Sequence, residues 1–241
     1  MSNQGTFVWY DLMTRNVETA RPFYTGLFGW TIKAVDMGPG GTYEMLHNGD
    51  APLGGLMPMN EGDHPSHWQA YIDVEDIAAK AKEVVALGGQ VAVGPMDIPG
   101  IGQFAVISDP QGAWISLFQA NNPPTGPAAR HTEHGDFQWS DLQTSDLPAA
   151  KSFYGAIAGW DTRESMDMGP AGEYAFAKAP SNTVGGLMTR PPEMPVSAWI
   201  HYVSVDNTDA TLAKALTLGG QVVAPPQDVP GMVRFAVVAD P

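Results

Sequence analysis

Two aspartates follow a tryptophan at the same spacing, one in each half of the chain. Asp11 lies two residues after Trp9, and Asp141 lies two residues after Trp139. If each segment is a strand, alternation places the Trp and the Asp on one face. A carboxylate beside an indole is costly to bury unless it is paired or hydrogen-bonded. Each aspartate is therefore a candidate general base or a group that binds a polar ligand atom; the alternative is a structural aspartate that accepts backbone N–H bonds at the strand end.

Histidines offer a second source of chemistry. The six are His47, His64, His67, His131, His134 and His201. His64-Pro-Ser-His67 has a His-x-x-His spacing, but no carboxylate or cysteine accompanies it, and the chain has no cysteine at all. Thiolate metal sites, disulfides and a thiol nucleophile are therefore excluded. We favour imidazoles that only hydrogen-bond, at the surface or in the core, over a histidine metal site.

The elements that must position these residues occur twice along the 241-residue chain. The repeated segments are Phe7–Thr14 and Phe137–Thr144, Phe23–Tyr24 and Phe153–Tyr154, Gly29–Trp30 and Gly159–Trp160, Gly54–Met57 and Gly185–Met188, Leu87–Val91 and Leu218–Val222, and Asp109–Pro110 and Asp240–Pro241. A period of 130 to 131 residues is too long for a solenoid, so each copy should be a complete domain with its own core. We predict domains over 1–119 and 137–241, joined by an exposed Pro-rich linker over 120–136.

Each copy in turn contains two similar modules. A strand over Phe7–Met13 precedes a helix, which Asn16 can cap and Gly29 ends. The apolar residues on one face of this helix are Ala20, Phe23, Tyr24, Leu27 and Phe28. Three short strands follow, and the same order returns from His67 to Phe118. The chain is thus predicted to be α+β, with four modules of the type βαβββ. The last module stops at Pro241, where the first copy continues into a strand, so either the sequence is a fragment or that strand is missing and leaves an unpaired edge.

Composition excludes several partners. The net charge is −14 at pH 7, which argues against nucleic acid and anionic membrane surfaces because both attract positive patches. No apolar run reaches the roughly 18 residues needed to span a bilayer, and the first residues do not resemble a signal peptide. We therefore expect a cytoplasmic protein that binds neither nucleic acid nor membrane.

The ordered set of motifs, present twice, resembles the vicinal oxygen chelate superfamily, which includes glyoxalase I, extradiol dioxygenases and bleomycin-resistance proteins. The resemblance rests on Phe23-Tyr24, Gly29-Trp30, the Leu-Gly-Gly segment at Leu87 and Asp109-Pro-Gln-Gly112. It implies two glyoxalase-like domains, each with a curved mixed sheet around a cavity that takes a ligand or metal. The chain also resembles tandem bacterial members of the superfamily, whose modules pair within one chain. We therefore expect a monomer with a pseudo-dimeric arrangement of its two domains.

Metal-dependent relatives bind a divalent ion through His or Gln on a first strand and Glu on a last strand. Counted from the shared landmarks, these positions hold Trp9, Gln69, Trp139, Ile200 and Ser116. Glu44 is an acid on a middle strand, outside the position of the family's glutamate. Because Trp, Ile and Ser cannot complete that ligand set, no metal site and no cofactor is predicted; a divalent metal has no support from the ligand positions.

The same resemblance predicts which residues line the cavities. They are Phe7, Trp9, Gln69, Tyr71, Trp114, Ser116, Phe137, Trp139, Tyr202 and Ser204, with Asp11 and Asp141 as candidate catalytic groups. Aromatic walls with a few polar groups suit a small organic molecule. The alternative for the aromatic residues is that they only fill the core.

Two functions remain open. One is a protein that binds a small molecule without the usual metal ligands. The other is a glyoxalase-like lyase or a hydroxylase that uses general acid–base chemistry at Asp11 or Asp141. The change away from metal ligands in both copies favours the first.

Overall fold

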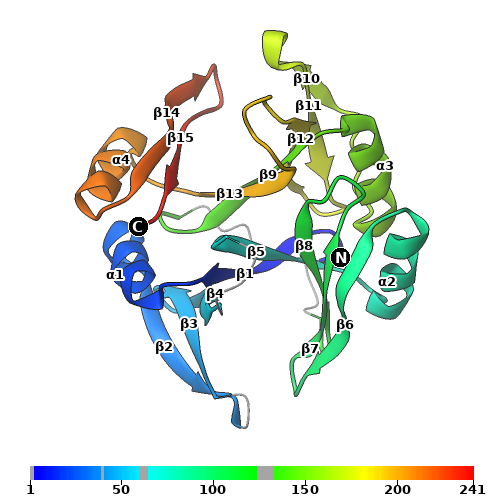
Figure 1. Cartoon of the computed structure of the whole chain (residues 1–241), viewed down its shortest axis with the longest axis horizontal. Coiled ribbons are helices and arrows are strands. Elements are labelled where there is room, and N and C mark those ends of the chain that lie inside the picture. The colour runs from blue at the N-terminus through cyan, green and yellow to red at the C-terminus, as the bar shows by residue number, and fades with distance from the viewer. Residues whose placement is uncertain (1–2, 39–40, 60–64, 124–132) are drawn as a thin grey trace. The chain divides into compact units, whose positions relative to one another are not determined.

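The computed structural model describes residues 3–38, 41–59, 65–123 and 133–241 (Figure 1). The elements of copy one are β1 (Phe7–Thr14), α1 (Val17–Phe28), β2 (Thr31–Asp36), β3 (Thr42–Asn48), β4 (Ala51–Pro58), β5 (His67–Asp73), α2 (Ile77–Ala86), β6 (Gln90–Ile98), β7 (Gly102–Ser108) and β8 (Trp114–Ala120). Those of copy two are β9 (Phe137–Thr144), α3 (Leu147–Ile157), β10 (Ser165–Asp167), η2 (Gly169–Ala171), β11 (Glu173–Lys178), β12 (Thr183–Thr189), β13 (Ala198–Val203), α4 (Thr208–Thr217), β14 (Gln221–Val229) and β15 (Val233–Ala239). The predicted βαβββ order is confirmed in the first three modules, and the fourth has its first four elements, β13, α4, β14 and β15.

The capping residue, the terminating glycine and the buried face predicted for α1 are confirmed. The Asn16 side chain accepts a hydrogen bond from the backbone N–H of Thr19 at 3.2 Å, which caps the helix N-terminus. Gly29 ends the helix with φ of 76°, a conformation that favours glycine. The buried residues of α1 are Ala20, Phe23, Tyr24 and Leu27, which lie on the predicted face.

The strands form mixed sheets in which every first strand pairs in parallel with the last strand of its module where that strand is present. The order is β2-β3-β4-β1 in the first module and β5-β8-β7-β6 in the second. In copy two it is β10-β11-β12-β9-β13, and β14 and β15 form a separate antiparallel pair. The sheets are curved and do not close into barrels, which agrees with the predicted fold class.

A glycine pair allows the parallel strands to approach each other. A Cβ at Gly54 would lie 1.6 Å from the carbonyl oxygen of Tyr10, and one at Gly185 would lie 1.8 Å from that of Ser140. These contacts explain the first glycine of the repeated Gly-Gly-Leu-Met segment in β4 and β12, because any side chain there would displace β1 or β9.

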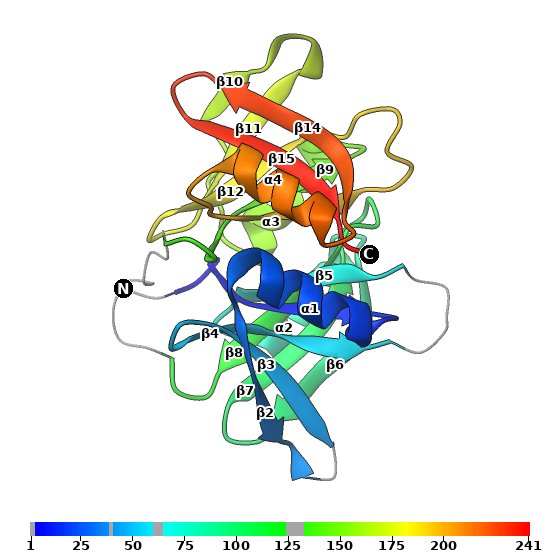
Figure 2. The same cartoon turned by 90° about the vertical axis from the view of Figure 1, so that its left-hand side faces the viewer.

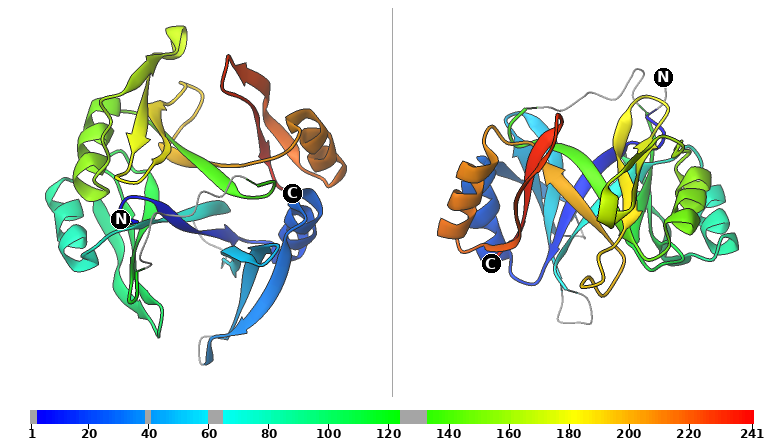
Figure 3. Two further views of the ribbon diagram at one scale, coloured as in Figure 1. Left: turned by 180° about the vertical axis from the view of Figure 1, so that it is seen from behind. Right: turned by 90° about the horizontal axis from the view of Figure 1, so that it is seen from above.

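The chain divides into two compact units. Unit 1 contains Met1–Trp9, Gln69–Arg130 and Gln138–Tyr202, and unit 2 contains Tyr10–Trp68, His131–Phe137 and Val203–Pro241. Each unit therefore combines segments from both copies. In unit 2, α1 packs beside α4 (Figures 1 and 2). In unit 1, α2 packs beside α3 (Figure 3). The boundaries 1–119 and 137–241 describe the sequence copies and stay a prediction.

The landmark motifs build the core of each unit through contacts between the copies. In unit 1, the Tyr154 hydroxyl donates to Asp109 at 3.2 Å, and the Trp160 indole donates to the Gly5 carbonyl at 2.7 Å. In unit 2, the Tyr24 hydroxyl donates to Asp240 at 3.2 Å, and the Trp30 indole donates to the Gly135 carbonyl at 2.8 Å. Each copy thus supplies the partner for the other copy's Phe-Tyr segment, and the Gly-Trp segments bond to Gly5 and Gly135, which precede β1 and β9.

The predicted linker differs from expectation at its end. Gly135 and Asp136 are buried rather than exposed, since Asn48 donates to the Asp136 carboxylate at 2.7 Å and Trp30 bonds to Gly135. Residues 124–132 of the linker, including His131, lie outside the described residues, as does His64 of the His-x-x-His segment. Across the described ranges, no helix is long and apolar enough to cross a membrane.

Candidate functional site

Asp141 on β9 of unit 1 is surrounded by hydrogen-bond donors. Its Oδ1 atom accepts from the Tyr174 hydroxyl at 2.6 Å and from the Trp139 indole at 2.9 Å. The Tyr202 hydroxyl and the backbone of Gly186 also hydrogen-bond to this carboxylate. We call Trp139, Asp141, Tyr174 and Tyr202 the Asp141 site. The Asp is 8% exposed, whereas the three aromatic residues are half-buried, so the aromatic residues are more accessible to solvent than the acid.

Burial sets the ionisation of this carboxyl group. It raises the pKa of Asp141 to about 6, although the hydrogen bonds from Tyr174, Trp139 and Tyr202 act in the opposite direction. Burial and the charge of Asp141 also raise the pKa of Tyr174 and Tyr202, so both hydroxyls remain donors at neutral pH. An acid with a pKa near 6 can change its protonation state close to physiological pH.

A second glycine, Gly186, leaves room for the ring of Tyr174 to reach Asp141. A Cβ at Gly186 would lie 2.1 Å from the ring of Tyr174, so the ring lies directly over this glycine of β12. Gly186 is also the strand neighbour of Asp141. The ring on β11 therefore crosses a strand without a side chain and brings its hydroxyl to the acid on the next strand.

Copy one repeats this contact in unit 2. The Tyr43 hydroxyl donates to Asp11 Oδ1 at 2.5 Å, and a Cβ at Gly55 would lie 2.2 Å from the Tyr43 ring. Asp11 is 6% exposed and pairs in register with Gly55. The Tyr–Asp–Gly arrangement is thus built twice. Asp11 and Asp141 therefore each accept a hydrogen bond from a tyrosine hydroxyl. The structural alternative considered from the sequence was an aspartate that accepts backbone N–H bonds only.

Sequence reasoning missed Tyr43 and Tyr174. Both occupy the same position of the repeat and precede the Gly-Gly segment at equal distance. A tyrosine retained in both copies, together with the second glycine of each pair, was the available signal. Phe176 was also missed; its ring lies 5.4 Å from that of Tyr174 and 6.4 Å from that of Trp139.

Module two supplies a separate polar contact within unit 1. The Gln69 amide donates to the Ser116 hydroxyl at 3.0 Å, and both side chains are buried. Tyr71 pairs in register with Ser116 across β5 and β8, and its ring lies 6.4 Å from that of Phe104. Trp114 lies at the start of β8 and is 36% exposed.

The two predicted phenylalanines pack in aromatic clusters. Phe7 lies 5.9 Å from Trp160 and 5.7 Å from Trp199, and Phe137 stacks on Tyr10 at 3.9 Å. These contacts are those expected of core aromatic residues. Ser204 follows β13, and its backbone pairs with Asp136 in unit 2. Ligand binding by Phe7, Phe137 and Ser204, and by the other predicted residues, stays a prediction.

A concavity of about 470 Å³ lies away from these residues. It is formed by α2 and β6, and its lining consists of Ala78, Ala81, Lys82, Val85 and Pro95. None of the predicted site residues belongs to this lining. The lining offers apolar atoms and one lysine, so the Asp141 site, where donors and an acid converge, is the better candidate site.

The residues at the family's metal positions do not fit a divalent ion. The Trp139 indole nitrogen is a donor only, and it donates to Asp141. The Gln69 amide and the Ser116 hydroxyl bond to each other. Among the described residues, no group of three or more His, Asp or Glu side chains is arranged to hold a metal.

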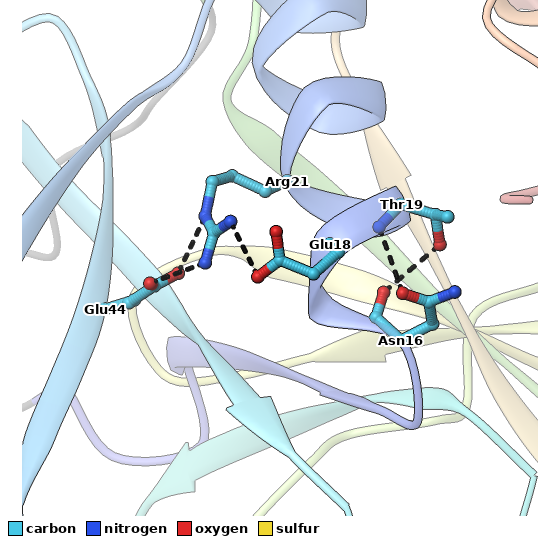
Figure 4. A network of polar contacts seen from close by, with 5 residues as sticks. All are labelled: Asn16, Glu18, Thr19, Arg21 and Glu44. Carbon is cyan, nitrogen blue, oxygen red and sulfur yellow. Dashed lines mark hydrogen bonds and ion pairs between the residues drawn. The ribbon is translucent and has the colours of Figure 1, made fainter.

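Glu44 has a different partner. Its carboxylate accepts from Arg21 of α1 through Nη2 at 2.8 Å and Nε at 3.3 Å, and Arg21 also contacts Glu18 at 3.1 Å (Figure 4). In copy two, Lys151 at the position of Arg21 also pairs with a strand carboxylate, that of Glu173 at 2.7 Å, although Glu173 lies at the repeat position of Thr42 and not of Glu44. Glu44 therefore links a helix to a sheet and is not directed to the first-strand positions.

The family model of the Glyoxalase/Bleomycin resistance protein/Dioxygenase superfamily matches residues 6–117 and again 131–241. The chain belongs to this superfamily. The two matches cover nearly the whole sequence, and the superfamily therefore accounts for both copies. The resemblance read from the landmark motifs is confirmed.

Two relatives match the chain over almost its whole length. A Mycobacterium tuberculosis protein named "Putative glyoxylase CFP32" is 40% identical over 99% of this chain and 92% of its own length. The "Anthracycline biosynthesis protein DauV" of a Streptomyces species is 31% identical over 98% of this chain and 90% of its own length.

Solved structures show the same fold at low identity. The Mn(II)-bound glyoxalase of Novosphingobium aromaticivorans has a TM-score of 0.65 and 14% identity, covering 100% of this chain and 80% of the other. A mutant of 4-hydroxymandelate synthase from Streptomyces coelicolor has a TM-score of 0.62 and 16% identity, covering 94% and 78%. Identities this low support the superfamily fold and not a shared reaction.

Proposed function

We propose that this superfamily member binds a small organic molecule on the half-buried rings of the Asp141 site, without the metal ligands of its metal-dependent relatives. The observation that carries the proposal is the convergence of Trp139, Tyr174 and Tyr202 on one buried carboxylate. Three rings offer apolar contact area, and the acid supplies a fixed acceptor for a ligand hydroxyl or N–H group.

Two further facts support this proposal. The donors around Asp141 are oriented by one another, because the Trp139 indole donates to the Tyr174 hydroxyl at 2.7 Å as well as to the acid. A carboxylate held in this way is pre-organised, which lowers the cost of ordering it when a ligand binds. In addition, the relative DauV is named for anthracycline biosynthesis, which is the chemistry of small organic molecules.

The test follows the indole N–H resonance of Trp139 by NMR, assigned with a Trp139→Phe variant. We expect a neutral aromatic alcohol, 3-phenylpropanol, to shift this resonance and to leave that of Trp114 in place. Asp141→Asn should weaken binding by about tenfold, the size expected for losing a bond to a charged group. A Trp139 resonance that does not respond, or equal affinity in Asp141→Asn, would contradict the proposal.

A second candidate is general-base catalysis. The pKa of Asp141, raised to about 6 by burial, favours this candidate because such a carboxylate is a stronger base than an exposed one. The reaction class would be proton abstraction next to a carbonyl group. Solvent deuterium incorporation into hydroxyacetone would reveal it; we expect a rate that rises through pH 6 and is absent in Asp141→Asn.

A further inference from the structure

The strand face of the Asp141 site continues into a second polar pair. Gln143 lies two residues after Asp141 on β9, so strand alternation places it on the same face. Gln143 is 8% exposed, and its Oε1 atom is buried without a hydrogen-bond partner. Buried amide oxygens are normally bonded, so this acceptor needs an explanation.

Arg190 directly follows β12, next to the end of β9. Its backbone N–H donates to the Thr144 carbonyl at 2.8 Å, which continues the parallel pairing in which Met188 is the neighbour of Gln143. The side chains of Met188 and Arg190 therefore share the face of Gln143. The Arg190 Nε atom is buried without a partner, while Nη1 donates to the Met194 carbonyl. Within the described part of the chain, no carboxylate pairs with Arg190.

The fold does not require this pair. Copy one has Met13 and Met59 at the corresponding positions. Met59 makes the same backbone bond, from its N–H to the Thr14 carbonyl at 2.7 Å, so the positions are structurally equivalent. The same strand arrangement therefore forms with two methionines. A buried acceptor and a buried cationic donor cost stability where thioethers would not.

We propose that Gln143 and Arg190 form a subsite, next to the Asp141 site, for a ligand carboxylate that carries a neighbouring hydroxyl. The Arg190 guanidinium would donate to the carboxylate, and Gln143 Oε1 would accept from the hydroxyl. The proposal rests on ligand binding at the Asp141 site and adds the ligand's chemical class. Arg190 carries a single positive charge, which matches a carboxylate better than a phosphate dianion.

Three probes, each with one aromatic ring, separate the contributions of the ligand's carboxylate and hydroxyl groups to binding. They are 3-phenyllactate, which has a carboxylate and a hydroxyl, 3-phenylpropionate, which has only the carboxylate, and neutral 3-phenylpropanol. Affinities are measured by calorimetry and by the Trp139 resonance. We expect the protein to prefer 3-phenyllactate over 3-phenylpropanol by about tenfold or more, because a bond to a charged group is lost in the alcohol.

Two variants copy the residues of copy one and should therefore fold. Arg190→Met should abolish the preference for both carboxylates and change 3-phenylpropanol binding less than about twofold. Gln143→Met should equalise 3-phenyllactate and 3-phenylpropionate. Arg163→Met is the matched control, because Arg163 lies in the same unit, its side chain is 91% exposed, and its ion-pair partner among the described residues is Asp161.

The outcomes separate the two proposals. If 3-phenylpropanol binds but the carboxylates have no advantage, or if Arg190→Met keeps that advantage, the subsite is wrong and the Asp141 site stands. If Arg163→Met removes the advantage equally, net charge explains it and the subsite is wrong. If none of the three probes shifts the Trp139 resonance, both proposals are overturned.

Discussion

The two copies contain the same Tyr–Asp–Gly contact in different surroundings. Tyr43 donates to Asp11 over Gly55, and Tyr174 donates to Asp141 over Gly186. Around the second acid, Gln143 and Arg190 replace Met13 and Met59 of copy one. The shared part depends on strand geometry, since the glycine, the ring and the acid lie on three adjacent strands. The differing part lies on the same face and is not required by that geometry, so it is the place to look for ligand recognition.

The largest expected effect tests the close parallel strand pairing that both copies share. Gly54→Ala and Gly185→Ala should each destabilise the fold by about 3 kcal/mol or more, because the added Cβ would overlap a backbone carbonyl that cannot move without separating the strands. Urea denaturation measures the change. Gly155→Ala in α3 is the control, since its nearest atom lies 3.6 Å away and alanine favours a helix. Similar losses in both copies would support a common scaffold, and a loss in one copy alone would contradict it.

The next effect concerns the pH dependence of Asp141. Its pKa is about 6 in the folded protein and ordinarily 3.8, so the folded state favours the protonated acid. That contribution to stability is complete below pH 4 and is lost as the pH rises through 6. Asp141→Asn should therefore raise the free energy of unfolding at pH 7 by about 1 to 3 kcal/mol relative to the unmodified protein, and by much less at pH 4.

Denaturation at several pH values checks this prediction. Asp73, whose pKa burial also raises to about 6, titrates in the same range, so the difference between the protein and its variant is the informative quantity. A difference that is constant from pH 4 to pH 7 would show that Asp141 has no raised pKa. Asp11→Asn is the companion variant in copy one and shows whether the behaviour belongs to one copy.

Much of the fold could be predicted from the sequence because its signals are local. Asn16 and Gly29 mark the ends of α1, and the spacing of Phe23 and Tyr24 gives its buried face. The grouping of modules into units could not be predicted. It depends on contacts such as Tyr154 with Asp109 and Trp160 with Gly5, which join residues far apart in the chain. A repeat shows that such residues matter but not which copy supplies the partner.

The candidate site was predicted only in part. Alternation correctly placed Trp139 and Asp141 on one face, as their 2.9 Å hydrogen bond shows. Tyr174 was missed because its hydroxyl reaches the acid across a strand, which no spacing along one segment reveals. Gln143 was missed for a different reason: a single glutamine in a strand has no pattern, and only its burial without a partner distinguishes it.

A smaller effect compares the two tyrosines. Tyr43→Phe and Tyr174→Phe should each cost about 1 to 2 kcal/mol in the free energy of unfolding, because each removes a donor to a buried carboxylate while the ring still covers its glycine. Tyr174→Phe should also raise the pKa of Asp141, since the lost hydrogen bond lowers it. Urea denaturation gives the first quantity, and NMR titration of the Asp141 carboxyl carbon gives the second. An unchanged titration would show that Tyr174 does not bond to this acid in solution.

The smallest effect isolates the difference between the copies. Gln143→Met should stabilise the protein without ligand by about 1 kcal/mol, because it replaces an unpartnered buried amide oxygen with a thioether of similar length. Most substitutions of buried residues destabilise, so a gain would be diagnostic. Met13→Gln is the reciprocal variant and should change stability by less, since Met13 is only half-buried. If Gln143→Met lowers the free energy of unfolding, the glutamine holds the fold together, and its orphaned acceptor no longer argues for a ligand.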